Sequence, residues 1–298
     1  MSTYSIKDLE HLSGIKAHTL RIWEQRYNFI APKRTGTNIR YYDDADLKLI
    51  LNVSLLKENG NKISKIAQLS LEEMHEEVLR LTEKNLRYQD QIHALVLAMV
   101  DLDEDRFEKI VATNILQLGF EKTMINVIYP YLSKIGILWQ TGAINPAQEH
   151  FISNLVRQKL IVAIDGQFVP ANENSKKYLL YLPAGELHEL SLLFSNYVIR
   201  SRGNKVIYLG QNLPFEDLEH VYNFHKPEYI LTIVTTSPGQ DQVQKYVDRL
   251  GTAFPDAQIL LSGYQVIGQD IQTQENTDIF NKLEDLIEFV DEQKSELV

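Results

Sequence analysis

The chain has 298 residues, enough for two or three modules of ordinary domain size, of which 44% are hydrophobic and 23% charged. This composition excludes a disordered or fibrous protein, and the absence of cysteine excludes disulfides, zinc–thiolate sites, iron–sulfur clusters and cysteine nucleophiles. The net charge of -10 is unevenly spread, because residues 1–70 carry 11 basic and 7 acidic side chains and the remainder has a balance of -14. A basic module joined to an acidic body favours a DNA-binding head.

No apolar run approaches the roughly 20 residues needed to cross a bilayer. The segment Met1–Lys7 also lacks the hydrophobic stretch of a signal peptide. We therefore expect a cytoplasmic protein with no membrane partner. Any metal bound by its side chains would need His, Asp or Glu as ligands.

Two short helices are predicted at the start of the chain. Ser5 with Asp8 three positions later has the form of a helix N-cap, and Gly14 ends the helix that follows. A second helix is expected over Lys16–Tyr27, where Leu20 and Trp23 are candidates for the core rather than for binding. Two short helices joined at a glycine describe a helix-turn-helix.

A wing is predicted directly after this motif. In the segment Pro32–Tyr42, Gly36 and Asn38 suit the tip of a tight hairpin that carries a basic and aromatic arm. Asp43 then begins a helix that continues through Leu55, and a shorter helix follows near Ile63–Leu69. Residues 1–70 are therefore expected to form a winged helix-turn-helix domain.

A helical region follows the head. Residues 71–88 are charged with a thin apolar stripe and predict a linking helix. Residues 89–168 carry longer stripes at helical spacing, which predict a four-helix bundle. The apolar residues of these stripes include Ile92, Leu95, Val96 and Met99, then Phe107, Ile110, Val111, Ile115 and Leu116. The polar segment 169–176 marks the next boundary.

The last part of the chain, residues 175–298, alternates short apolar runs with amphipathic segments. The runs predict buried parallel strands at 178–182, 206–209, 229–234 and 259–261. Helices are expected near 187–202, 215–225 and 240–253. This alternation predicts a doubly wound, Rossmann-like α/β domain with its ligand site beyond the carboxyl ends of the strands. The expected loops follow Leu182, Leu209, Val234 and Leu261.

The first 70 residues resemble the MerR family of transcriptional regulators. The segments that carry the resemblance are Thr19–Tyr27, Pro32–Arg34 and Ile39–Tyr42. The resemblance implies a dimer on a near-palindromic operator in double-stranded DNA, with the second helix in the major groove and the wing on the backbone.

Seven residues would contact DNA by this resemblance: Thr19, Arg21, Gln25, Arg26, Arg34, Arg40 and Tyr41. Arg21 would face the groove, where an arginine can read guanine, and Thr19 and Gln25 would mostly fix the register. Arg34 and Arg40, on the wing, would hold phosphates together with Tyr41. The alternative is that these arginines only solvate a small basic domain.

Beyond residue 88 the chain resembles the light-sensing, cobalamin-binding branch of that family, the CarH type. In the bundle, Trp139 is followed after nine residues by Glu149 and His150. In the α/β domain, Gly185–Leu190 follows the first strand and Tyr208–Pro214 closes the second. The resemblance implies adenosylcobalamin, and therefore cobalt, as the bound cofactor.

The resemblance also implies roles for the motif residues. His188 would be the lower axial ligand of cobalt, oriented by an acid from its own loop or by Asp217. Trp139 would cover the upper face, Glu149 would bind the adenosyl ribose, and His150 would line the same cavity. The alternatives are that His188 is a surface or capping residue, that Trp139 belongs to the core of the bundle, and that Glu149 and His150 only form a solvated helix start.

The chain departs from the wider cobalamin-binding pattern at several positions. Glu186 replaces an aspartate, and Ser191 replaces a glycine that admits the nucleotide tail of the cofactor. Ser237, with Pro and Gly after it, replaces a serine motif, and only Gly263 remains of a glycine pair. Gln140 stands where light-sensing members often have a histidine, so photochemistry could differ or be absent.

These features together predict a multidomain, non-enzymatic regulator. We expect a repressor and photoreceptor that forms a homodimer or homotetramer and binds its operator under the control of adenosylcobalamin. The alternatives are a regulator that senses a different ligand or a partner protein through the same fold, and a corrinoid enzyme. A corrinoid enzyme would need a substrate-activating domain, for which the three modules leave no room.

Overall fold

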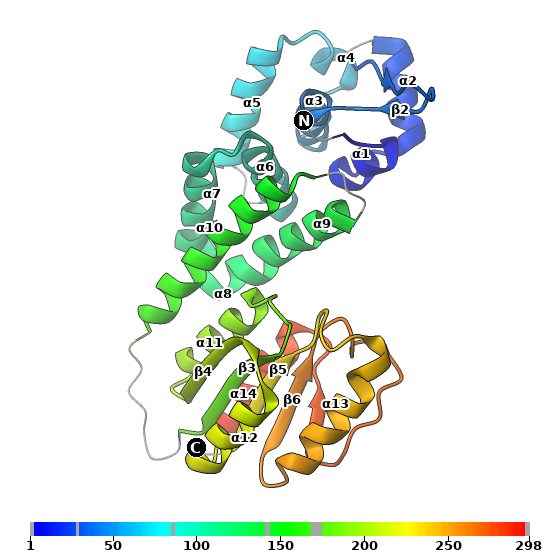
Figure 1. Cartoon of the computed structure of the whole chain (residues 1–298). Coiled ribbons are helices and arrows are strands. Elements are labelled where there is room, and N and C mark those ends of the chain that lie inside the picture. Colours follow the sequence, from blue (N-terminus) through cyan, green and yellow to red (C-terminus); the bar gives the residue numbers. More distant parts are fainter. Residues whose placement is uncertain (1–2, 28–29, 85–86, 141–143, 168–174, 296–298) are drawn as a thin grey trace. The chain divides into compact units, whose positions relative to one another are not determined.

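The computed structural model describes residues 3–27, 30–84, 87–140, 144–167 and 175–295. The chain divides into two compact units, Met1–Leu155 and Val156–Val298, which are coloured from blue to green and from green to red in Figure 1. Among the described helices, none combines the length and the apolar character that a membrane span requires.

The head is a winged helix-turn-helix. Its elements are α1 (Ile6–Ser13), α2 (Ala17–Tyr27), β1 (Lys33–Arg34), β2 (Arg40–Tyr41), α3 (Asp44–Glu58) and α4 (Ile63–Ile66). Capping boxes start α1 at Ser5 and α3 at Asp43, as the sequence predicts, and Gly14 ends α1 with a φ of 72°. Leu20 and Trp23 of α2 are buried in the core, which confirms their expected structural role.

The second part of this unit is helical and includes α5 (Leu71–Lys84), α6 (Tyr88–Asp101) and α7 (Glu104–Leu118). A long helical segment follows, made of α8 (Phe120–Thr123), a π-helical turn η1 (Met124–Ile128) and α9 (Tyr129–Gln140). The fourth helix of the bundle is α10 (Pro146–Asp165), and the division between the two units falls within it. The central four-helix bundle predicted from the apolar stripes is therefore present.

One residue of the predicted stripes is on the wrong side of α7. Leu116 is 86% exposed, whereas Phe107, Ile110 and Val111 are buried as expected. Because each residue turns the helix by about 100°, Asn114 and not Leu116 continues the buried face. The Asn114 side-chain NH2 group donates there to the Ile110 carbonyl at 2.8 Å and to Gln91 Oε1 at 3.1 Å.

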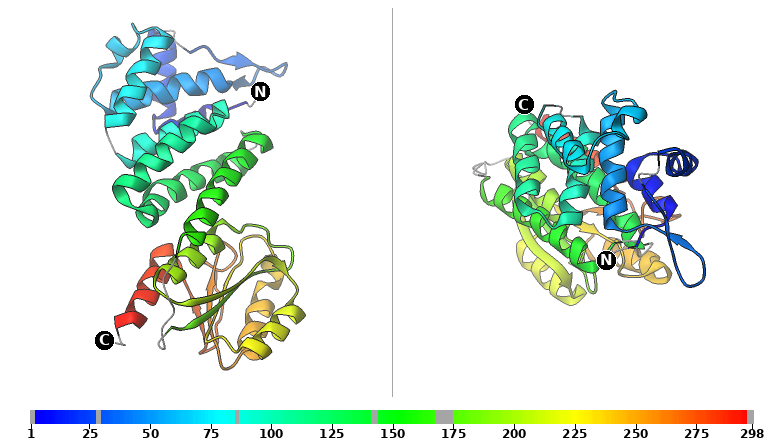
Figure 2. Two further views of the ribbon diagram at one scale, coloured as in Figure 1. Left: turned by 90° about the vertical axis from the view of Figure 1, so that its left-hand side faces the viewer. Right: turned by 90° about the horizontal axis from the view of Figure 1, so that it is seen from above.

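The second unit contains a five-stranded parallel sheet in the order β4-β3-β5-β6-β7. The strands are β3 (Lys177–Pro183), β4 (Lys205–Leu213), β5 (Tyr229–Ile233), β6 (Gln258–Ser262) and β7 (Thr277–Ile279). The helices are α11 (Leu190–Ser201), α12 (Phe215–His225), α13 (Gln240–Ala253) and α14 (Leu283–Ser295). Helices α11 and α14 cover one face and α12 and α13 the other, which confirms the doubly wound, Rossmann-like fold (Figure 2).

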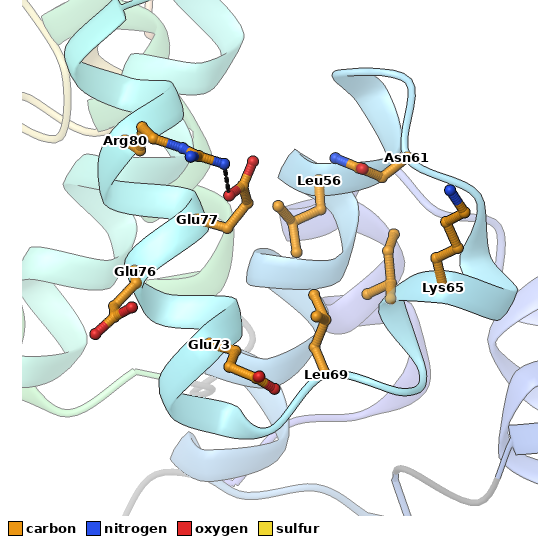
Figure 3. Close-up of a pocket in the computed structure, with 9 residues that line it drawn as sticks. Leu56, Asn61, Lys65, Leu69, Glu73, Glu76, Glu77 and Arg80 are labelled. Atoms are coloured by element: carbon orange, nitrogen blue, oxygen red, sulfur yellow. Dashed lines mark hydrogen bonds and ion pairs between the residues drawn. The ribbon is translucent and has the colours of Figure 1, made fainter.

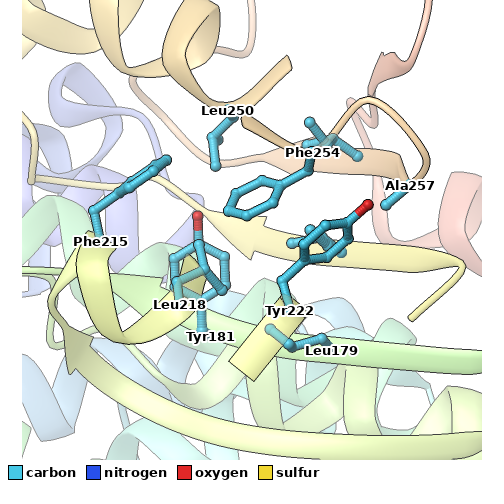
Figure 4. Close-up of a cluster of buried hydrophobic side chains, with 10 residues drawn as sticks. Leu179, Tyr181, Phe215, Leu218, Tyr222, Leu250, Phe254 and Ala257 are labelled. Carbon is cyan, nitrogen blue, oxygen red and sulfur yellow. The ribbon is translucent and has the colours of Figure 1, made fainter. Parts of the chain in front are cut away.

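An aromatic core lies between the sheet and the α12–α13 face (Figure 4). The rings of Phe215 and Phe254 are 5.6 Å apart, and those of Tyr222 and Phe254 are 4.7 Å apart. Such pairs contribute about 0.5–1.5 kcal/mol each beyond their burial. The Tyr181 hydroxyl, on β3, is buried with them and hydrogen-bonds the Tyr246 hydroxyl at 2.5 Å. This packing makes the strand ends a rigid support for the loops that follow them.

The second strand of this sheet is longer than the sequence indicates. The prediction that it ends at Leu209 is wrong, because β4 continues to Leu213. The chain passes through Gly210 and Asn212 with φ values of 74° and 58°, and the pairing register with β3 shifts there. A glycine and an asparagine tolerate this left-handed backbone, so the strand bends without ending.

Candidate functional site

The loop that carries His188 lies at the topological switch point of the sheet. It joins β3 to α11, and β3 is flanked by β4 on one side and β5 on the other. Chain connections leave the carboxyl ends of β3 and β5 in opposite directions at such a point, and a crevice opens between them. The crevice is the usual place for a ligand in an open α/β sheet.

The fully buried Glu186 carboxylate joins the two loops that meet there. One oxygen, Oε1, accepts hydrogen bonds from the His188 backbone at 3.1 Å and from His188 Nδ1 at 2.5 Å. The other oxygen, Oε2, accepts backbone N–H groups of the loop after β5, from Thr235 at 2.8 Å, Thr236 at 2.5 Å and Ser237 at 3.2 Å. A single side chain therefore holds both loops in place.

These hydrogen bonds keep Glu186 ionised. Burial by itself would raise the pKa of the carboxyl, but the His188 side chain and the backbone donors of Thr236, His188 and Ser237 outweigh it and hold the pKa well below its usual value of 4.5. An ionised carboxylate can only accept, so Nδ1 of His188 is the donor, and in the neutral form of the ring the lone pair is on Nε2. That tautomer leaves Nε2 as the nitrogen that could bind a metal, with the carboxylate orienting the ring through Nδ1.

The residues of this loop fit a metal that is carried by a macrocycle. The His188 side chain is 59% exposed, so a large planar ligand can approach it. Within the part of the chain that the structure describes, no group of three or more His, Asp or Glu could hold a metal ion. One oriented imidazole suffices for a cobalt whose four equatorial ligands come from a corrin.

Contacts around this loop involve residues that the sequence pattern did not single out for a role. Asn212 accepts the Gly185 N–H at 2.8 Å, and Gly185 has a φ of 82° at which a Cβ would lie 2.8 Å from Ser237 Oγ. Ser237 in turn donates to the Ala184 carbonyl at 2.8 Å. The predicted residues Glu186, His188 and Ser237 therefore come together, with Asn212, Thr235 and Thr236 as additional members.

Gly263, also predicted for the cofactor, follows β6. It has a φ of 111°, and a Cβ there would overlap the backbone of Val234 at the end of β5. The glycine is thus explained by close packing of two loops. Ser191 lies half-buried in the first turn of α11, and Asp217 is exposed in the first turn of α12.

The predicted cofactor residues of the bundle lie at two helix ends. Glu149 and His150 are in the first turns of α10, with His150 Nδ1 3.2 Å from Glu149 Oε2 and the Ser153 hydroxyl donating to Glu149 Oε1 at 2.5 Å. Trp139 and Gln140 are the last residues of α9, and their side chains lie outside what the structure describes. The proposed contacts of these residues with the cofactor therefore stay predictions.

The predicted DNA contacts lie on α2 and on the wing. Arg21, Gln25 and Arg26 are exposed on α2, and Thr19 is half-buried. On the wing, Arg34 pairs with Arg40 across the two strands, Tyr41 is half-buried beside them, and the Arg34 guanidinium donates to Asn38 Oδ1 at 2.7 Å.

Buried Tyr42 connects the wing to α2. Its hydroxyl donates to the Glu24 carboxylate, and burial raises its pKa, so the phenol stays protonated. Lys33, by contrast, lies 2.5 Å from an oxygen of Asp43 and 3.0 Å from one of Asp46. The Lys33 charge is therefore paired with carboxylates of the head, whereas the arginines of the wing are exposed to solvent.

A pocket of about 520 Å³ lies elsewhere in the first unit, between the end of α3, α4 and α5 (Figure 3). Its lining contains Leu56, Asn61, Lys65, Ile66, Leu69, Glu73, Glu76, Glu77 and Arg80. None of the predicted site residues is among them, and its three glutamates disfavour a phosphate ligand.

Comparison with known proteins agrees with this arrangement. Residues 4–73 match the family described as "MerR HTH family regulatory protein", and residues 91–163 match the "B12 binding domain". The HTH-type transcriptional repressor CarH of Myxococcus xanthus is 27% identical over 259 residues, which are 85% of this chain and 86% of CarH. The repressor CarA of the same organism is 29% identical over 259 residues, which are 85% of this chain and 84% of CarA. The chain therefore combines a MerR-type helix-turn-helix with a B12-binding domain, and over most of its length it is similar to CarH and CarA.

A solved structure extends the comparison to the fold of this MerR-type regulator. The monomethylamine corrinoid protein of Methanosarcina barkeri aligns with a TM-score of 0.53 at 12% identity. The alignment covers 65% of this chain and 94% of the corrinoid protein. At this identity the likeness concerns the fold alone.

Proposed function

We propose that this CarH-like regulator is a repressor whose oligomeric state and operator binding are controlled by adenosylcobalamin. The observation that carries the proposal is the Glu186–His188 pair at the switch point of the sheet, with the Nε2 lone pair on an accessible ring. The names of its relatives CarH and CarA support the assignment as a repressor. The match to a B12-binding domain supports the choice of ligand.

In this proposal His188 would hold the cobalt, and Glu186 would orient its ring through the hydrogen bond to Nδ1. Trp139, Glu149 and His150 of the bundle would contribute the contacts to the adenosyl group. The cofactor, when bound, supplies a cobalt–carbon bond that light can break. The cofactor would bind two arrangements of the bundle with different affinities, so its binding would shift the population toward one of them.

The proposal is tested by mixing the purified chain with adenosylcobalamin in darkness and then illuminating it. We expect a bound-cobalamin absorption spectrum, a larger sedimentation coefficient in darkness, and tight operator binding that illumination removes. If the protein binds cobalamin but light changes neither its sedimentation nor its operator binding, the chain senses cobalamin without photochemistry, in line with Gln140. The absence of any bound spectrum would contradict the proposal and favour a different ligand.

The proposed DNA contacts predict two different kinds of loss. Arg21→Ala should weaken the free energy of operator binding by about 1–3 kcal/mol and relax the sequence preference at the base pair that Arg21 reads. Arg40→Ala should weaken binding to all sequences and reduce the dependence of log affinity on log salt by about one unit. Titrations of operator and scrambled DNA at several salt concentrations measure both effects.

Lys33→Ala is the matched control on the wing, because the Lys33 ammonium is already paired with Asp43 and Asp46. It should leave the salt dependence nearly unchanged. If Arg21→Ala and Arg40→Ala both bind the operator as the unaltered chain does, the assignment of α2 to the major groove is wrong.

A further inference from the structure

The C-terminus of α1 is capped by side chains from other helices. The last carbonyl groups of a helix have no partners within it and need donors from elsewhere. The Glu10 carbonyl accepts the Gly14 N–H at 2.8 Å, and the Ser13 carbonyl accepts the Ser54 hydroxyl of α3 at 2.7 Å. The Leu12 carbonyl accepts Lys134 Nζ of α9 at 3.2 Å. A lysine of the bundle therefore caps a helix of the DNA-binding head.

Lys134 makes this contact in a partly buried polar cluster. His93 of α6 is 2% exposed and also hydrogen-bonds the Leu12 backbone, and burial lowers the pKa of His93 to about 4. The ring is therefore neutral at pH 7. Burial lowers the pKa of Lys134 as well, while the Glu58 carboxylate of α3 opposes that shift. The Lys134 Nζ thus donates at the C-terminal end of α1, where the helix dipole favours a positive group.

A second set of polar contacts joins the end of α3 to the start of α6. The Asn59 amide donates to Asp90 Oδ2 at 3.3 Å, and the Arg87 guanidinium donates to the Glu58 carbonyl at 3.1 Å. Asp90 is 1% exposed. Breaking the Asn59–Asp90 contact would leave a buried carboxylate with one partner fewer, which is costly, whereas the Arg87 contact is exposed. The head and the bundle are therefore joined by polar contacts at two places, α1–α9 and α3–α6.

The position of Lys134 connects two functional ends of the chain. Its helix, α9, ends at Gln140 and contains Trp139 in its last turn. Its partner, Leu12, precedes Gly14, the turn that leads into α2 with the predicted DNA contacts. A movement or rotation of α9 would therefore act on the helix-turn-helix in part through the Lys134 side chain.

We propose that Lys134 is a positioning residue that couples cobalamin binding in the bundle to the placement of the DNA-binding head, through its hydrogen bond to the Leu12 carbonyl. This inference rests on the proposed function, because it needs a ligand that acts on the bundle. The inference adds one specific contact that couples the two sites. Because proximity alone does not show coupling, the coupling has to be measured.

The test is a comparison of operator affinity with and without adenosylcobalamin in darkness, using the full chain. Lys134→Met keeps the apolar stem and removes the donor, whereas Lys134→Arg keeps a donor. We expect at least a tenfold effect of cobalamin on the unaltered chain and less than a twofold effect on Lys134→Met. Lys134→Arg should retain most of the effect, and cobalamin affinity should change less than twofold in both variants. Lys122→Met, at an exposed position of α8, is the matched control and should behave as the unaltered chain.

The outcomes separate the two proposals. If cobalamin binds but does not change the operator affinity of the unaltered chain, the proposed function fails and this coupling fails with it. If the unaltered chain and Lys134→Met respond equally to cobalamin, the proposed function stands and the role of Lys134 is wrong. Amide hydrogen exchange without cobalamin gives a second readout. The amides of the turn after α1 should exchange at least tenfold faster in Lys134→Met, and unchanged exchange there would also overturn the inference.

Discussion

Replacing His188 by Ala is expected to remove the protein ligand from cobalt. Because Nδ1 of His188 is held by Glu186, Nε2 is the nitrogen that would bind the metal, and alanine offers no substitute. We expect cobalamin affinity to fall by at least about tenfold, since even a residue that only orients a metal ligand typically contributes 10–100-fold. The absorption spectrum should change to that of cobalamin with its own base or water as the lower ligand.

Electron paramagnetic resonance of the cobalt(II) form tests the ligand directly. In chain labelled with ¹⁵N-histidine, the nitrogen splitting of the unaltered chain should change from three lines to two. In His188→Ala, labelling should have no effect on the spectrum. His220→Ala, exposed on α12, is the matched control and should retain the labelled splitting. A two-line splitting that persists in His188→Ala would show that another histidine binds the cobalt.

Replacing Glu186 by Ala is expected to impair both the ligand and the fold. The carboxylate accepts backbone N–H groups from Thr235, Thr236 and Ser237 as well as the His188 ring. Each buried donor left without a partner costs about 1–3 kcal/mol, so we expect a loss of about 3 kcal/mol or more in the free energy of unfolding. Cobalamin affinity should fall about 10–100-fold, because the ring loses the group that orients it. Chemical denaturation and cobalamin titration measure the two losses.

Glu186→Gln separates the charge from the shape of this side chain. Because the folded-state pKa of Glu186 lies below its usual value of 4.5, its ionised form contributes stability that is fully present above that value. The contribution is lost as the pH falls through about 4.5 toward the lower folded value. Glu186→Gln should therefore lose less stability than the unaltered chain between about pH 5 and pH 3. Asp217→Asn, exposed on α12, is the control and should leave cobalamin affinity unchanged. A loss of affinity in Asp217→Asn but not in Glu186→Gln would show that Asp217 is the acid that orients His188.

Several local features of the fold could be predicted from the sequence. The capping boxes at Ser5 and Asp43 act over three residues, and they start α1 and α3 where the pattern indicates. The buried strands of a parallel sheet are recognisable as short apolar runs, because both faces are covered by helices. The prediction for Leu116 is wrong because Leu116 adjoins the apolar stripe in the sequence, whereas helical geometry places it on the exposed side of α7.

The last strand and helix were missed for a different reason. Strand β7, Thr277–Ile279, is a short strand at the edge of the sheet and has little apolar signal of its own. Its pairing with β6 stabilises it, and this pairing depends on the rest of the sheet. Helix α14, Leu283–Ser295, follows directly and packs near α11. Elements at the edge of a sheet depend more on tertiary context than on their own pattern.

The sequence alone indicates which residues are candidates for binding cobalamin and DNA. His188 and an acid two positions before it were recognisable as a motif, as were the basic residues of α2 and of the wing, because both patterns are local in the chain. The choice of Glu186 over Asp217 as the acid beside His188 was decided by the tertiary structure. The tertiary structure also created the hydrogen bonds between Glu186 and the backbone of Thr235 and Thr236, and the hydrogen bond from Lys134 to Leu12. These contacts join residues 49, 50 and 122 positions apart, and they exist only because the strand order and the helix packing bring the segments together.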